Sequence, residues 1–213
     1  MINPVIAQRV RQALDFGARP DPARGIFETM LVSDGTVPLL DAQLERLRAS
    51  ADELYGTTLE PTLARELRSA APPGTARLRV TLRPGLSPQI EHGPRPPDPV
   101  YTRIAPFELP GGLGPHKWAD RDLLDAITAA AGERTLPLLL DLDHSLLEAT
   151  SMNVLIEEHG RLISPPADGR FRAGFGRTRL QYDEEPVDLD RLLAADAVVL
   201  TSALRVVRLS LTG

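Results

Sequence analysis

The stretch Pro115-His116-Lys117-Trp118-Ala119-Asp120-Arg121 lies near the middle of the 213-residue chain and is the best starting point for interpreting it. A glycine-rich run, residues 111–114, comes before it, and a helical pattern of apolar residues begins at Leu123. The sequence therefore predicts that Lys117 lies at a junction between a loop and a helix, where a lysine can face a cleft. The alternative is an ordinary solvated lysine, as most lysines are.

Composition narrows the class of protein. The chain has 24 Lys plus Arg and 29 Asp plus Glu, a net charge of −5 with scattered basic residues, which argues against nucleic acid as a partner. Cysteine is absent, which excludes disulfides, thiolate metal sites and a cysteine nucleophile, and no metal ligand is predicted. Met1 to Leu14 carries a weak helical pattern without a long apolar segment. We therefore expect a cytoplasmic protein with no membrane partner.

The first half of the chain predicts a sheet with helices. Gly25 to Ser33 reads as a strand, and Asp34-Gly35 predicts a hairpin turn before a second strand at Val37 to Leu40. Asp41 is expected to cap a helix that ends near Gly56. The remaining elements are a helix at 62–70, an alternating half-buried strand at 77–83, a proline-rich surface loop at 84–99 and a strand at 100–109.

The second half predicts further strands around a short polar block. Leu136 to Asp141 reads as a buried strand, and His159-Gly160 as the turn of a hairpin. Glu148 and Asn153 stand out as polar residues set against apolar runs, which a strand end and a loop would also explain. The linker candidate is 110–115, so the predicted domains are 1–109 and 116–213.

Two further sequence features suggest that the protein binds an anion. Gly174-Phe175-Gly176-Arg177 precedes a short helix, and a glycine-rich turn that enters a helix leaves backbone N–H groups to bind an anion. Arg46 and Arg48 lie off the apolar row of the first helix, where either is solvated or reaches an anion. Together with Lys117 and an acidic residue, these are the groups that pyridoxal phosphate needs.

At this point the sequence resembles the fold-type IV pyridoxal-phosphate enzymes, the class IV aminotransferase family. Gly25 to Thr29 looks like the family's first-strand signature, and Gln43-Leu44-Glu45-Arg46-Leu47 resembles its His-Leu-x-Arg-Leu helix with Gln43 in place of histidine. Leu147 to Val154 is similar to its Glu-x-x-x-x-Asn block. The segments 164–166, 174–177 and 201–203 resemble the signatures around the phosphate.

Within the family, Lys117 to Arg121 looks most like the actinobacterial aminodeoxychorismate lyases, some of which are fused to the synthase that makes their substrate. The chain departs from the family pattern in its helical N-terminus, in Gly176 for a common threonine and in Val206 for a common glycine. The resemblance implies a two-domain α/β fold like that of D-amino acid aminotransferase, with the cofactor between the domains. It also implies a homodimer and a functional link to aminodeoxychorismate synthase.

The resemblance also assigns roles to residues. Lys117 would hold the cofactor and move the substrate proton, and Thr29 would assist. Arg46 would bind the phosphate, Glu148 would face the pyridine nitrogen, and the other expected cofactor-binding residues are Asn153, Phe175, Gly176 and Ser202. Arg121 and Ala203 would contact the substrate.

The implied reaction is the elimination that converts 4-amino-4-deoxychorismate into 4-aminobenzoate and pyruvate, a carbon–oxygen lyase step toward folate. Two alternatives remain open. One is a class IV aminotransferase that acts on branched-chain or D-amino acids, and the other is a non-catalytic homologue.

Overall fold

The computed structural model describes residues 11–12 and 19–211, which fall into two compact units. The smaller unit contains Pro20–Pro97 and His116–Asp120, and the larger contains Asp98–Pro115 and the chain from Arg121 onward. The division therefore differs from the predicted domains 1–109 and 116–213. The reason is that the segment around Lys117 bonds to the strand that begins at Ile26, so it returns to the smaller unit.

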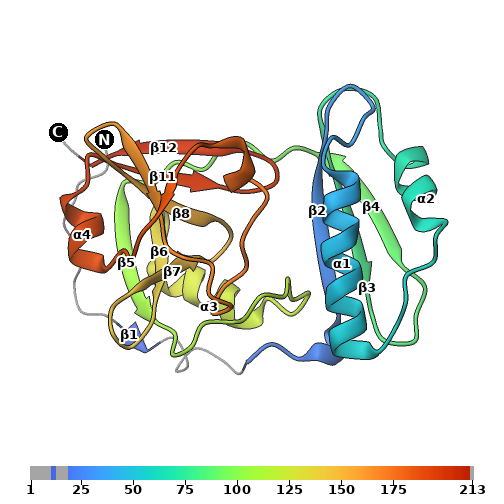
Figure 1. Ribbon diagram of the computed structural model, residues 1–213, viewed down its shortest axis with the longest axis horizontal. Coiled ribbons are helices and arrows are strands. Elements are labelled where there is room, and N and C mark those ends of the chain that lie inside the picture. The colour runs from blue at the N-terminus through green and yellow to red at the C-terminus, as the bar shows by residue number, and fades with distance from the viewer. Residues whose placement is uncertain (1–10, 13–18, 212–213) are drawn as a thin grey trace. The chain divides into compact units, whose positions relative to one another are not determined.

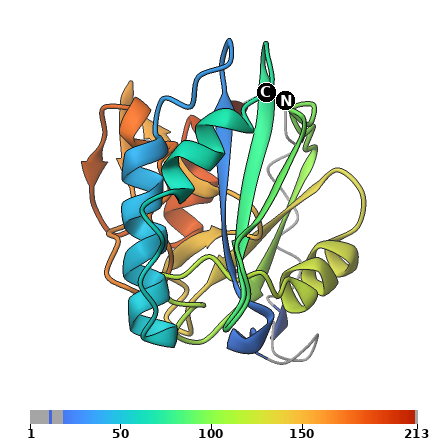
Figure 2. The same ribbon diagram turned by 90° about the vertical axis from the view of Figure 1, so that its right-hand side faces the viewer.

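The smaller unit is built on a three-stranded antiparallel sheet in the order β2-β3-β4. The strands are β2 (Ile26–Val32), β3 (Ala76–Leu82) and β4 (Gln89–Pro94), and a 3-10 turn, η2 (Pro22–Arg24), precedes β2. Helices α1 (Leu40–Tyr55) and α2 (Leu63–Ser69) lie on the same side of this sheet (Figure 2). Their apolar residues and the even-numbered residues of β2 and β3 form one core.

Helix α1 follows the predicted apolar row and ends as predicted at Gly56, which has the left-handed φ of 59° that favours glycine. Its start differs from the prediction. The N-cap is Leu39, and the Asp41 carboxylate instead accepts a 2.9 Å bond from Arg68 of α2. The predicted strand at Val37 to Leu40 is wrong, because Asp34-Gly35 closes only a single bridge, Ser33 to Thr36, before the chain turns into α1.

The proline-rich loop predicted at Pro84 to Pro99 is also partly wrong, because it contains β4, which pairs with β3 from Gln89 to Pro94. The prolines flank this strand or sit at its end, and an edge strand tolerates them because one side of its backbone needs no partner. The predicted helix at 62–70 and strand at 77–83 are confirmed as α2 and β3.

The larger unit contains two sheets (Figure 1). One has the order β1-β5-β6-β7, with β1 (Arg11–Gln12), β5 (Arg103–Glu108), β6 (Thr135–Leu140) and β7 (Leu146–Ala149). The other has the order β10-β9-β8-β11-β12, with β8 (Asn153–Glu158), β9 (Arg161–Ser164), β10 (Asp183–Glu184), β11 (Ala197–Thr201) and β12 (Val206–Ser210).

Among its described residues the larger unit also contains the helical segments α3 (Asp122–Ala131), η3 (Arg177–Arg179) and α4 (Leu189–Ala194). Helix α3 packs its apolar residues against β5, β6 and β7, and α4 joins the core that both sheets share. The helical pattern at Met1 to Leu14 lies mostly outside the described residues, and the two that are described, Arg11 and Gln12, form β1.

The mixed α/β architecture confirms the predicted fold class. Among the helices of the described chain, none is long and apolar enough to cross a membrane.

Candidate active site

One candidate site of the smaller unit is the side of its sheet that faces away from α1 and α2. Side chains alternate along a strand, so Phe27 and Thr29 of β2 lie opposite the even-numbered core residues. The register pairs Thr29 with Arg79 and Phe27 with Thr81 of β3. This face therefore carries hydroxyls and a guanidinium around one aromatic ring.

Lys117 joins the same face because its segment runs along β2. Phe27 N–H donates a 2.9 Å bond to the Lys117 carbonyl, and Ala119 N–H donates a 2.9 Å bond to the Gly25 carbonyl. Between them, Trp118 forms an isolated antiparallel β-bridge with Ile26. Trp118 packs against the helix-side core, so alternation turns its neighbours Lys117 and Ala119 to the opposite face. The Lys117 ammonium nitrogen, Nζ, lies 4.7 Å from the centroid of the Phe27 ring, a cation–π contact.

Lys117 is the only lysine in the chain, since the other 23 of the 24 basic residues are arginines. The single lysine can be counted in the sequence, and it identifies the candidate cofactor lysine more firmly than the residues around Lys117 do. Any cofactor that is attached to a lysine of this protein must be attached to Lys117.

His116 points away from this face toward α1. Its Nδ1 lies 3.0 Å from Ser50 Oγ, its Nε2 lies 3.6 Å from Glu53, and its ring meets Trp118 edge-on. These contacts give His116 a structural role within the smaller unit.

Arg46 is fixed by a buried carboxylate. Its Nε and Nη2 donate bonds of 2.7 and 2.9 Å to the two oxygens of Glu28, whose side chain is only 2% exposed. Glu28 lies on the helix side of β2, and Arg46 lies on α1 above it. Sequence reasoning missed Glu28, although a carboxylate among the apolar residues of a strand signals a buried ionic partner.

Gln43, which stands where the family pattern has a histidine, also forms a hydrogen bond with β2. Its side chain is 1% exposed, and its Nε2 donates a 2.7 Å bond to the backbone carbonyl of Thr29. Since a buried amide is costly without a partner, this bond holds the backbone at Thr29 in place.

In the larger unit, Glu148 and Asn153 come together across the turn between β7 and β8. Asn153 Nδ2 lies 3.3 Å from Glu148 Oε2 and donates a 2.9 Å bond to the Arg172 carbonyl. Its Oδ1 accepts a short bond from the Gly174 N–H. Asn153 is buried, with 2% exposure. Its bonds connect the carboxylate of Glu148 with the glycine-rich turn.

That turn lies against the end of β11. A Cβ on Gly176 would lie 2.5 Å from the Ser202 carbonyl and 2.8 Å from Thr201 Cβ, so only glycine permits this approach. Within the described part of the chain, the buried atoms Arg177 Nε, Arg177 Nη1 and Thr201 Oγ1 have no hydrogen-bond partner. Unsatisfied buried polar atoms are rare, which indicates a place where a ligand oxygen would be stabilised.

Arg121 and Ala203 occupy separate positions in the larger unit. Arg121 donates a short bond to the Thr150 carbonyl between β7 and β8. Burial lowers the pKa of its guanidinium, while the carboxylates of Asp125 and Glu148 act in the opposite direction. The carbonyl of Ala203 accepts a 2.9 Å bond from Arg179, next to Ser202.

The predicted site residues thus divide between the units. The smaller unit holds Lys117 and Thr29 on one side of its sheet and Arg46 on the helix side. The larger unit holds the other seven, namely Arg121, Glu148, Asn153, Phe175, Gly176, Ser202 and Ala203. The amine, the oriented carboxylate and the tight glycine turn with its unsatisfied buried atoms fit the chemistry of pyridoxal phosphate. Phe27 and Arg79 were missed, although the alternation of β2 and β3 places them on this face.

Comparisons with known proteins identify the family and the fold. The family model described as "Amino-transferase class IV" matches residues 25–209. A comparison with curated protein sequences finds no match.

Among solved structures, the 4-amino-4-deoxychorismate lyase from Pseudomonas aeruginosa is 24% identical with a TM-score of 0.70, over 91% of this chain and 86% of that one. A fold IV-transaminase from Curtobacterium pusillum is 20% identical with a TM-score of 0.67, over 86% and 77%. A hypothetical aminotransferase from Mycobacterium tuberculosis in its PLP-bound form is 23% identical with a TM-score of 0.64, over 87% and 79%. These likenesses show a shared fold.

Proposed function

Because the chain belongs to the class IV aminotransferase family, whose cofactor is pyridoxal phosphate, we propose that it is a 4-amino-4-deoxychorismate lyase. It converts this substrate into 4-aminobenzoate and pyruvate. The observation that carries the proposal is the placement of Thr29 and the only lysine, Lys117, on one face of the β2 sheet around Phe27. A hydroxyl and an amine on one face can share the proton transfers that an elimination needs.

Each unit supplies part of the binding groups. In the smaller unit, Lys117 holds the cofactor and Arg46, oriented by Glu28, binds its phosphate. In the larger unit, Glu148 faces the pyridine nitrogen, and Asn153 keeps the carboxylate in position. Phe175, Gly176 and Ser202 form the phosphate cradle, and Arg121 and Ala203 shape the substrate side.

When bound, pyridoxal phosphate accepts into its ring the electron pair that is released when the substrate loses its proton. Lys117 Nζ removes that proton from the carbon that bears the amine, and the Thr29 hydroxyl orients the substrate or relays the proton. Glu148 favours the protonated ring nitrogen through its negative charge. The bond between the ring carbon and the ether oxygen then breaks, and the six-membered ring becomes aromatic. The side group leaves as enolpyruvate, which takes up a proton and becomes pyruvate.

The test is release of pyruvate from 4-amino-4-deoxychorismate without any added α-keto acid. Stoichiometric 4-aminobenzoate and pyruvate are expected. A requirement for an α-keto acid, with the cofactor cycling to its amine form, would instead establish an aminotransferase, and a purified protein without the absorbance of lysine-bound cofactor would favour a non-catalytic homologue.

We further propose that the protein works in the cytoplasm as a homodimer and takes its substrate from aminodeoxychorismate synthase. Size-exclusion chromatography with light scattering tests the dimer, and an active monomer would contradict it.

A further inference from the structure

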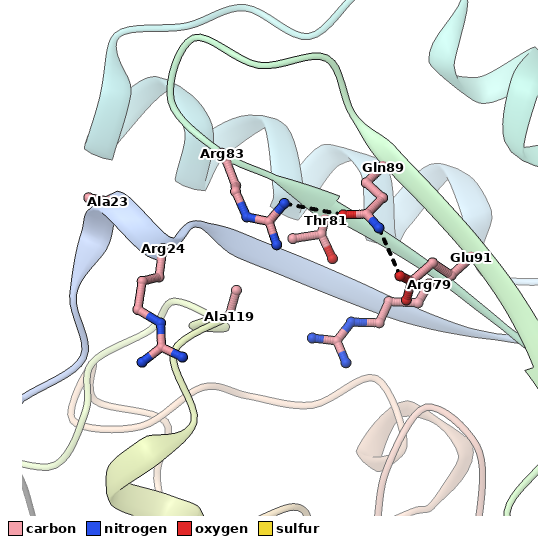
Figure 3. A pocket seen from close by; sticks show the side chains of 8 residues that line it. All are labelled: Ala23, Arg24, Arg79, Thr81, Arg83, Gln89, Glu91 and Ala119. Carbon is pink, nitrogen blue, oxygen red and sulfur yellow. Dashed lines mark hydrogen bonds between the residues drawn. The ribbon is translucent and has the colours of Figure 1, made fainter.

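The polar face of the smaller unit contains a cavity of about 470 Å³ (Figure 3). It is lined by Ala23, Arg24, Arg79, Thr81, Arg83, Gln89, Glu91 and Ala119. All of these belong to the smaller unit and come from η2, β3 with the residue after it, β4 and the Lys117 segment. None of its arginines was singled out from the sequence as a site residue.

Three guanidinium groups and one carboxylate, that of Glu91, line this cavity, so its charge is positive. Neighbours hold the charged groups in place. Arg83 Nη1 donates a 3.2 Å bond to Gln89 Oε1, and Gln89 Nε2 donates a 2.9 Å bond to Glu91. Figure 3 shows this chain of bonds along one wall. The excess of guanidinium groups over carboxylates therefore favours an anionic ligand in this cavity.

The cavity and Lys117 belong to the same side of the sheet. The guanidinium carbon of Arg79 lies 3.8 Å from the centroid of the Phe27 ring, the same ring that Lys117 Nζ contacts at 4.7 Å. Ala119, two residues after Lys117, forms part of the cavity wall. Arg79 and Lys117 thus share Phe27 as a neighbour, which connects the cavity wall with the segment that carries the amine.

The arginines are spaced for more than one anionic group. Arg79 and Arg83 are four residues apart on an extended strand, so their Cα atoms lie about 13 Å apart with Thr81 between them. A third guanidinium, that of Arg24, enters from η2, where its Nη1 also bonds Asp120 at 2.9 Å. A single carboxylate would use only part of this set.

We infer that this cavity binds the carboxylates of a dicarboxylate substrate, with Arg79 and Arg83 as specificity-determining residues. The inference rests on the proposed function and deepens it, since 4-amino-4-deoxychorismate carries two carboxylates. An amino acid with one carboxylate would leave the positive charge of the cavity partly uncompensated, so the site discriminates against such substrates.

The test is calorimetric binding of chorismate, a dicarboxylate that lacks the reactive amine, to the holoenzyme. Wild-type protein should bind chorismate more tightly than benzoate, and Arg83→Gln should weaken chorismate binding about tenfold or more, the scale of a lost charge-assisted bond. Arg79→Gln should act in the same direction. Glu91→Gln should tighten binding, by roughly twofold to fivefold.

Arg65→Gln is the matched control, because Arg65 is an exposed arginine of the same unit on α2 and does not line the cavity. Its affinity for chorismate should equal that of wild type. Equal affinities in the wild type, Arg83→Gln and Glu91→Gln, or no binding of chorismate at all, would overturn the inference.

Steady-state kinetics separates this inference from the proposed lyase. Arg83→Gln should raise KM with little change in kcat. Pyruvate release with an unchanged KM in this variant would overturn the dicarboxylate site and leave the lyase standing. Arginine-dependent chorismate binding without pyruvate release would support the site and overturn only the lyase.

Discussion

Lys117 Nζ lies 4.7 Å from the centroid of the Phe27 ring, and backbone bonds between the Lys117 segment and β2 hold the two residues in this relation. The reactive amine is therefore placed by sheet pairing and by an aromatic neighbour. A side chain positioned by its backbone needs little packing of its own, so it can be replaced without loss of the fold.

Lys117→Arg should abolish turnover and all covalent attachment of the cofactor, because the chain has no second lysine. Arginine keeps a cation above Phe27, so the melting temperature should stay close to that of wild type. Borohydride reduction followed by peptide mass spectrometry measures the attachment. A reduced adduct on any other residue, in either protein, would refute the assignment of Lys117.

Glu148→Gln should keep cofactor binding but slow turnover by several powers of ten, at about 1.4 kcal/mol for each power. The amide oxygen can still accept the bond from Asn153, whereas the negative charge that favours the protonated ring nitrogen is lost. Single-turnover kinetics with the loaded enzyme measures the effect. Glu133→Gln, at an exposed position of the same unit, is the control and should leave the rate unchanged.

Glu28→Ala should destabilise the protein by about 2–3 kcal/mol, because it leaves the guanidinium of Arg46 without its carboxylate partner in a mostly buried place. The affinity for pyridoxal phosphate should fall as well, since Arg46 loses its orientation. Denaturant unfolding and a cofactor titration measure the two effects.

The exposed pair of Arg48 and Glu45 on the same helix is the comparison for this ion pair. Glu45→Ala should cost less than about 1 kcal/mol, as exposed ion pairs do. Equal costs for the two substitutions would show that burial of Glu28 adds nothing.

Gly176→Ala should weaken cofactor binding about tenfold or more, because its Cβ would meet the Ser202 carbonyl at 2.5 Å and push apart the two sides of the cradle. Equilibrium dialysis with pyridoxal phosphate measures the loss. At Gly93 a Cβ meets nothing closer than 3.8 Å, so Gly93→Ala should bind the cofactor as wild type does. Full cofactor affinity in Gly176→Ala would argue against the cradle.

Asp141→Asn should reduce stability only above acidic pH. Bonds from the Gly111 N–H and from Arg170, at 3.0 and 2.8 Å, hold the pKa of Asp141 below its ordinary 3.8. A carboxyl whose pKa is lowered by folding stabilises the protein above its unfolded pKa and loses that contribution as pH falls through the folded one.

The difference in unfolding free energy between wild type and Asp141→Asn should therefore be about 1 kcal/mol near neutral pH and should vanish well below pH 3.8. Denaturant unfolding across this range measures it. A constant difference for Asp141→Asn down to strong acid would contradict the argument.

Local sequence patterns determined much of the secondary structure and many of the candidate site residues. The apolar row and Gly56 placed α1, alternation placed β3, and the motifs around Lys117, Glu148 and Gly174 to Arg177 pointed to one cofactor, because spacing and glycine chemistry act within a few residues. The count of a single lysine was equally present in the sequence.

Only the tertiary structure decided which distant residues meet. It returned the Lys117 segment to β2, paired Glu28 with Arg46, and set Arg79 of β3 beside the ring that Lys117 contacts. In the tertiary structure, Gln89–Pro94 also pairs with β3 as an edge strand. Strand pairing joins residues that are far apart in the chain, and no local pattern records which edge a segment will choose, so these relations follow from the packing of the whole unit.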